Sequence, residues 1–178
     1  MADNYKPLYF MNLDNLNDLP EWDDERMREL NGEEEGDEWK PNPTSDACKA
    51  LYKKWNEIIV MLRGALNDIG DDEPGQHDAS FIRDQQEMIL GDAFEVGAKI
   101  RSSEAGSLYI LKMENAAIIR KNAQYIKTAM LGMMADDEVE ETYCMVIRDE
   151  IDNFRALYKQ WIATFKKDEF EDEWGLFV

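Results

Sequence analysis

The charged residues with the most regular spacing lie in the C-terminal half of the chain. Arg148, Asp152 and Arg155 are separated by four and then three residues, so on a helix they share one face. Arg120 and Lys127 are two helical turns apart on the preceding expected helix, near residues 107–134, and flank its apolar stripe. We call these five residues the cationic cluster. If the two helices are neighbours, its four cations border one seam.

Two interpretations of the cationic cluster stay open. Boundary charges between packed helices usually pair with acids, and Asp152, Glu57 and Glu87 are candidates, so an interhelical salt-bridge lattice is the favoured interpretation. The alternative is an anion-binding pocket between helices, because helical bundles also build ligand sites from facing side chains.

Residue patterns that support catalysis are weak in this sequence. A ferritin-like di-metal site needs Glu-x-x-His motifs on two helices, and the chain has a single histidine, His77, in an expected turn. A cysteine nucleophile needs an activating group, and Cys144 lies four residues before Arg148, but it also continues an apolar stripe. The sequence therefore favours a protein that is not an enzyme, with no catalytic residue, metal or cofactor assigned.

Both cysteines are expected to be reduced core residues. Cys48 and Cys144 fall on apolar positions of separate expected helices, where a free thiol packs as a small hydrophobic group. The N-terminus has neither a basic region nor an apolar stretch of the kind that directs export. We therefore expect a cytoplasmic protein that does not enter a membrane.

The elements that position these residues are four helices, expected near 45–69, 79–101, 107–134 and 137–166. Each carries apolar residues at alternating spacings of three and four, and no stretch shows the strict alternation of a strand. The strongest stripe, in the fourth helix, consists of Cys144, Ile147, Ile151, Phe154, Tyr158, Trp161 and Phe165. Similar lengths and short connections predict an all-α, antiparallel up-down four-helix bundle over residues 44–167.

Several residues are expected to mark the ends of these helices. Thr44 or Ser45 is expected to cap the first one, because side-chain oxygens of Ser and Thr accept hydrogen bonds from free amides there. Lys166 and Lys167 are expected at the C-terminal end of the fourth, where the helix dipole favours cations.

The two ends of the chain are strongly acidic. Residues 1–43 hold 13 acids against 4 bases, and residues 168–178 hold 5 acids and no base. We expect an irregular N-terminal arm that docks in places, with a short helix near Asp23–Leu30, and a short acidic C-terminal tail. In the tail, Trp174 and Phe177 are the expected contact residues. Trp174 is expected to pack on the flank of its own bundle that bears the cationic cluster, and a basic groove on another protein is the alternative.

Four segments carry a resemblance to known sequences. They are the run Glu114-Asn-Ala-Ala-Ile-Ile-Arg-Lys-Asn-Ala123, the run Ile147-Arg-Asp-Glu-Ile-Asp-Asn-Phe-Arg155, the segment 161–165 and the ending Glu173-Trp-Gly-Leu-Phe177. Together they resemble uncharacterised bacterial helical-bundle proteins of no assigned activity. The resemblance covers the third and fourth expected helices and the tail, about half of the chain. It implies a helical bundle and brings no catalytic residue with it.

The net charge of −19 over 178 residues argues against direct nucleic-acid binding, which needs basic side chains to replace phosphate counterions. The leading hypothesis is a non-enzymatic interaction or scaffold protein whose acidic, aromatic-bearing ends contact a protein partner. One alternative is an acidic inhibitor that mimics nucleic acid in the basic groove of a DNA-binding protein. The other is an enzyme or small-ligand binder with an anion-binding pocket between helices. Homo-oligomerisation also stays open.

Overall fold

The computed structural model describes residues 19–30, 36, 40–66, 79–106 and 108–177. Within these ranges the chain forms five helices and no strand. The helices are α1 (Asp24–Leu30), α2 (Pro43–Leu66), α3 (Ala79–Glu104), α4 (Tyr109–Ala135) and α5 (Glu141–Ile162). The expected all-α class is confirmed. Among the described helices, none combines the length and the hydropathy needed to cross a bilayer.

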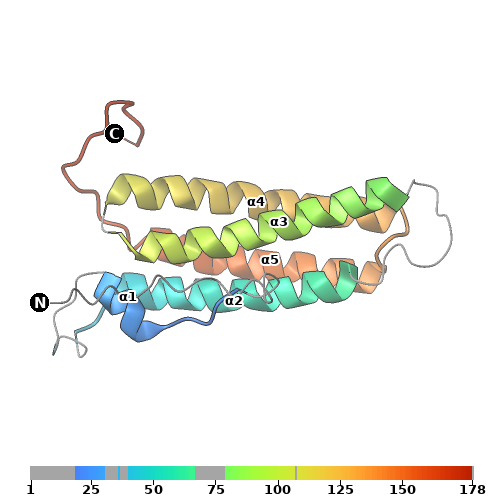
Figure 1. The fold of residues 1–178 in the computed structure, drawn as a ribbon, viewed down its shortest axis with the longest axis horizontal. Helices are drawn as coiled ribbons and strands as arrows, with labels where there is room; N and C mark the ends of the chain where they lie inside the picture. Colours follow the sequence, from blue (N-terminus) through green and yellow to red (C-terminus); the bar gives the residue numbers. More distant parts are fainter. Residues whose placement is uncertain (1–18, 31–35, 37–39, 67–78, 107, 178) are drawn as a thin grey trace, which may run out of the picture.

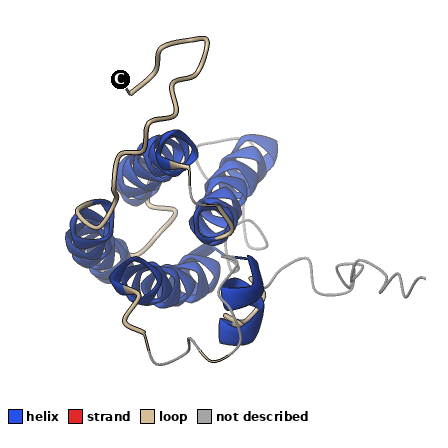
Figure 2. Cartoon of the chain, turned by 90° about the vertical axis from the view of Figure 1, so that its left-hand side faces the viewer, coloured by secondary structure: helices blue, strands red, loops and turns tan. Residues whose placement is uncertain are grey.

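The four long helices lie side by side along the length of the molecule (Figure 1). Helix α2 packs against α3, α3 against α4, α4 against α5, and α5 back against α2. Figure 2 shows the same helices nearly end-on, arranged around a common interior, with α1 outside the ring. The apolar faces predicted by the three-and-four spacing therefore meet along one shared core.

The side chain of Trp55, on α2, links three of the helices that form this core. It is fully buried, and its ring lies 4.6 Å from the ring of Phe154 on α5. The indole N–H donates a hydrogen bond to the backbone carbonyl oxygen of Ala93 on α3, at 2.7 Å. A buried indole is stable only when its N–H has an acceptor, so this bond allows the whole ring to leave water. One residue of α2 thus fixes the positions of α3 and α5.

Both cysteines are free and buried, as the sequence predicted. The thiol of Cys48 donates to the carbonyl oxygen of Ile100 at 3.4 Å, and that of Cys144 donates to Met130 at 3.2 Å. Burial raises the pKa of both thiols, and the nearby Arg148 lowers that of Cys144 by less than burial raises it. The thiols are therefore protonated core groups and poor nucleophiles.

Helix α2 begins two residues earlier than expected and has a different cap. Asn42, and not Thr44 or Ser45, supplies the capping oxygen: its Oδ1 accepts a hydrogen bond from the amide of Ser45 at 3.1 Å. Pro43 occupies the first helical position, where its missing N–H is no loss. The Asn-Pro pair is thus the start signal of this helix.

Helix α5 is four residues shorter at each end than expected. The connection before it turns at Asp137, which adopts a φ of 59°, and buries Val139 to 5% exposure. Phe165 lies beyond the end of the helix but still packs edge-on against Trp161, with ring centroids 4.7 Å apart. Lys166 and Lys167 consequently lie in the loop, so the expectation that they end the helix is wrong.

The tail supplies the N-terminal cap of α4. Leu108 precedes the helix and offers no side-chain hydrogen bond. The carboxylate of Asp168 instead accepts a hydrogen bond from the amide of Tyr109 at 2.7 Å, although the two residues are 59 apart in sequence. A carboxylate at this position also complements the positive end of the helix dipole. The segment that follows α5 is therefore tied to the start of α4.

The described part of the N-terminal arm docks on α2 and α3. The hydroxyl of Tyr52 donates to the carbonyl oxygen of Pro20 at 2.6 Å, and the rings of Trp22 and Tyr52 lie 5.5 Å apart. Met27 of α1 is 3% exposed. Leu19 lies directly over Gly97, so closely that a Cβ at that position would overlap its methyl groups. The present position of the Leu19 side chain against α3 therefore depends on the absence of a Cβ at position 97.

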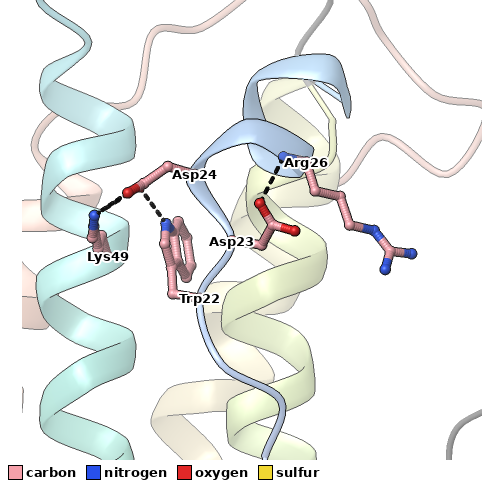
Figure 3. Close-up of polar contacts among 5 residues, drawn as sticks. All are labelled: Trp22, Asp23, Asp24, Arg26 and Lys49. Carbon is pink, nitrogen blue, oxygen red and sulfur yellow. Dashed lines mark hydrogen bonds and ion pairs between the residues drawn. The ribbon is translucent and has the colours of Figure 1, made fainter.

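Polar contacts fix the orientation of α1 (Figure 3). Asp24 accepts hydrogen bonds from Nζ of Lys49 at 2.5 Å and from the indole nitrogen of Trp22 at 3.1 Å. Asp23 caps the helix, since its carboxylate accepts a hydrogen bond from the amide of Arg26 at 3.0 Å. The expected short helix near Asp23–Leu30 is thus present and held to α2.

Replacing Gly97 with Ala is expected to force Leu19 away from α3 and loosen the arm without unfolding the long helices. Trypsin should then cleave after Arg26 or Arg28 about fivefold faster, because local opening exposes these bonds. Gly91→Ala, on the same helix, is the matched control: beyond its chain neighbours and the backbone of its own helix, its added Cβ meets nothing within 4 Å. That variant should be cleaved at the wild-type rate and be more stable by about 0.5–1 kcal/mol. Equal acceleration in both variants would contradict the proposed packing.

Candidate functional site

A groove of about 310 Å³ lies between α4 and α5. Its floor is apolar and is formed by Ala123, Ile151, Phe154, Tyr158 and Ile162. The remaining lining residues, all polar or charged, are Arg120, Gln124, Lys127, Asp152, Arg155 and Lys159. Four of these are cations and one is an acid, on a chain whose net charge is −19. The groove therefore combines an apolar surface with a local charge opposite to that of the whole molecule.

Asp152 is the centre of the ion pairs at this groove. Its Oδ1 lies 2.5 Å from Nζ of Lys127 on α4 and 3.3 Å from Nη2 of Arg155 on its own helix. The hydrogen bond from Lys127 holds the pKa of Asp152 below its usual value, and the charges of Lys127 and Arg155 lower it further. Asp152 thus stays ionised and holds two cations at the groove.

The other two cations are differently placed. Within the described part of the chain, neither Arg120 nor Lys159 forms an ion pair, and both side chains are exposed. Arg120 is close enough to Tyr158 for its charge to lower the pKa of that phenol, although burial raises it by more. These two side chains are consequently available to an anion from outside.

Arg148, the fifth member of the cationic cluster, has a separate role. Its Nη1 donates a hydrogen bond to the backbone carbonyl oxygen of Lys127, and it does not line the groove. This bond joins α5 to α4 beside the groove. The structure thus brings Arg120, Lys127, Asp152 and Arg155 together and uses Arg148 to hold the two helices in place.

The acids expected to neutralise this cluster lie elsewhere, apart from Asp152. Glu57 pairs with Lys54 at 2.5 Å, and Lys54 also pairs with Glu150 of α5 at 2.9 Å. Glu87 is exposed on α3 and does not line the groove. An interhelical ion-pair network therefore exists between α2 and α5, whereas the α4–α5 groove keeps an excess of positive charge.

The sequence did not indicate every lining residue, and Lys159 and Tyr158 are the two of most consequence for the groove. Lys159 lies four residues after Arg155 and so shares its helix face, a spacing that could have placed it in the cluster. Tyr158 was expected only as a core residue, yet its ring forms part of the floor. Its hydroxyl donates to the carbonyl oxygen of Ala116 at 2.8 Å, which holds the ring against α4.

The C-terminal tail presents its aromatic residues to solvent. Trp174 is 87% exposed and Phe177 is 37% exposed, so the expected packing of Trp174 on its own bundle is not present. The reason is local: the amides of Gly175 and Leu176 donate to the carbonyl and carboxylate oxygens of Asp172, both at 3.2 Å. This turn directs the chain end away from the helices (Figures 1 and 2).

A further polar cluster lies where α2 begins and α3 ends. Glu104 is 2% exposed, and its negative charge adds to the effect of burial in raising the pKa of the Cys48 thiol, whereas Lys112 lowers it. The ammonium of Lys112 lies 6.0 Å from the ring centroid of Phe165. Among the described residues, no cluster of three or more His, Cys, Asp or Glu side chains could hold a metal ion.

Replacing Asp152 with Asn tests its ion pairs through their pH dependence. Because the folded-state pKa of Asp152 lies below the usual value of about 4, its contribution is present above that pH and is lost as the pH falls through the lowered pKa. Asp152→Asn should therefore reduce the free energy of unfolding by up to about 1 kcal/mol at pH 7 and by less below pH 4. Urea unfolding at several pH values measures this. Asp149→Asn, at an exposed site of the same helix, is the control: its difference from wild type in the free energy of unfolding should not shrink as the pH falls.

The α4–α5 groove and the C-terminal tail are the two features of the described chain whose chemistry suits a ligand or a partner. A relation to bacterial helical-bundle proteins of no assigned activity stays a prediction. None of the protein-family models, curated proteins and solved structures compared with this chain matches it.

Proposed function

We propose that this chain is a non-enzymatic interaction protein, an antiparallel up-down four-helix bundle whose α4–α5 groove binds an acidic protein segment with an aromatic anchor. The observation that carries the proposal is the groove itself, in which four cations and one acid surround an apolar floor on a molecule of net charge −19. The closed ring of contacts between successive helices supports the bundle assignment.

Charge selects the kind of ligand. Arg and Lys side chains bind carboxylates through charge-assisted hydrogen bonds, which are stronger than neutral ones. Asp152 pairs with only two of the four cations, Lys127 and Arg155. Arg120 and Lys159 form no ion pair with any described residue and can bind a further carboxylate. A negative segment that approaches the predominantly acidic molecule is therefore attracted at this groove and repelled elsewhere.

The floor of the groove selects an apolar anchor. Tyr158 and Ile162, both only partly buried, offer ring and aliphatic surface between the cations, above the buried ring of Phe154. The volume of about 310 Å³ is at the lower end of the ~300–1,000 Å³ typical of small-molecule sites, which suits one large side chain better than a cofactor. Trp, Tyr and Arg are also enriched among the few residues that carry most of the binding energy at protein interfaces. A segment with one Trp or Phe among several acids combines both requirements.

The groups that line the groove are suited to binding and not to proton transfer. General acid–base catalysis works best with a group that titrates near the operating pH. The carboxylate of Asp152 is held ionised, and burial raises the pKa of the Tyr158 phenol above its usual value.

The two free, buried thiols further support a reducing compartment such as the cytoplasm as the place where the protein works.

The proposal is tested with an acidic synthetic peptide that carries one central tryptophan, titrated into isotope-labelled protein. Backbone amide signals of α4 and α5 around the groove should shift, and Arg120→Gln should weaken binding about fivefold, the effect of losing one exposed charge interaction of ~1 kcal/mol. Lys121→Gln is the matched control, since Lys121 is exposed, adjacent in sequence and not part of the groove.

A second peptide, with lysines in place of the acids, should leave the groove signals unchanged. The proposal fails if both peptides shift the same signals, or if Arg120→Gln and Lys121→Gln weaken binding equally. Either result would mean that the peptide senses general surface charge and not this groove.

A further inference from the structure

We infer that the acidic segment received by the α4–α5 groove is the C-terminal tail, residues 168–177, of a second copy of this chain. Trp174 is the anchor that enters the groove. The inference rests on the proposed function of the groove and adds the identity of its occupant.

The tail has the composition that the groove requires. Its charged residues are five acids with no base, and they surround Phe170 and Trp174. Phe170 is 52% exposed and Trp174 87% exposed, so much of the apolar surface of the tail, and nearly all of that of Trp174, is not covered by its own chain. Large exposed aromatic groups are a common mark of a contact surface.

The tail is also held in a shape that presents Trp174. Asp168 accepts hydrogen bonds from the amides of Tyr109 and Phe170, at 2.7 and 3.0 Å. Asp172 closes the turn that contains Trp174, and Gly175 adopts a φ of 66° within it. Fewer conformations are therefore lost when the indole is bound, which lowers the entropic cost of association.

The charges of the tail and the groove are complementary, although two whole molecules repel each other. The tail carries acids only, whereas the groove has four cations against one acid. At about 0.15 M salt the screening length is ~8 Å, so repulsion between distant parts of two chains of charge −19 is damped more than contacts at ion-pair distance. The local attraction can thus determine the association.

The direction of the tail favours a second copy over its own bundle. The chain is fixed at the start of α4 by Asp168 and from there leads away from the helices (Figures 1 and 2). Each copy has one tail and one groove, so a reciprocal exchange fills both grooves in a dimer of twofold symmetry. Such a dimer leaves no unfilled groove from which a longer assembly would grow.

The oligomeric state of the full chain tests the inference. Light scattering and sedimentation at about 0.15 M salt should give a mass that rises with concentration from 20.7 kDa toward twice that value. Trp174→Ala and Arg155→Glu should each weaken the association by about tenfold or more, the effect of losing a central contact. Both side chains are exposed, so neither change should unfold the protein. Tyr143→Ala and Lys121→Glu, at exposed sites outside the groove, should leave the association unchanged.

A mixing experiment separates exchange between copies from contacts within one copy. The Trp174→Ala chain keeps an intact groove, and the Arg155→Glu chain keeps an intact tail. At a concentration at which wild type is largely dimeric, each variant alone should be mostly monomeric, whereas a mixture should form a heterodimer with one of the two contacts restored. No heterodimer in the mixture, although wild type dimerises, would overturn the exchange.

The remaining outcomes distinguish this inference from the function on which it rests. A wild-type chain that stays monomeric at all concentrations overturns the second copy as occupant. If the acidic tryptophan peptide still binds the groove, the proposed function stands and only the occupant is wrong; if it does not bind, both are wrong. Groove signals that differ between monomeric wild type and monomeric Trp174→Ala would show that the tail fills its own groove, which also overturns the inference.

Discussion

The hydrogen bond from the Trp55 indole to the carbonyl oxygen of Ala93 is the interaction on which most of the structure depends. The ring belongs to α2, its acceptor to α3, and its aromatic neighbour Phe154 to α5. A wide apolar ring brings several helices together only when its one polar atom is satisfied in the interior. Phe154 in turn forms part of the groove floor, so the geometry of the groove follows from the packing of the core.

Much of the fold could be predicted from the sequence because, in each long helix, the spacing of the apolar residues indicates which face is buried. Cys144, Ile147 and Ile151 are buried as their separation of three and four residues implies. The features that were missed depend on residues far apart in the chain. No local pattern indicates that Leu19 packs on Gly97 or that Asp168 caps α4. The early end of α5 could not be predicted for a similar reason. Phe165 continues the apolar spacing and packs against Trp161, although it lies beyond the end of the helix.

The candidate site was predictable to the same degree and for the same reason. Helical spacing brought Asp152 and Arg155 together, and the pairing of helices added Lys127. Whether a cation lines the groove or bonds to the backbone depends on the distance between two helices, which a single sequence does not contain. Arg148 therefore could not be separated from its neighbours in advance. The exposure of Trp174 depends on a turn closed by Asp172, whose hydrogen bonds become visible only in three dimensions.

The bond between Asp168 and the amide of Tyr109 has a mechanical consequence. A pull on the C-terminal end does not act on the last turn of α5 alone, because Asp168 transfers part of the tension to the first turn of α4. The load is then divided between two helices that already pack against each other. Tension along their axes must shear this contact before either helix can be peeled from its neighbours one turn at a time. The end of the molecule is thereby reinforced at the point where the tail leaves it.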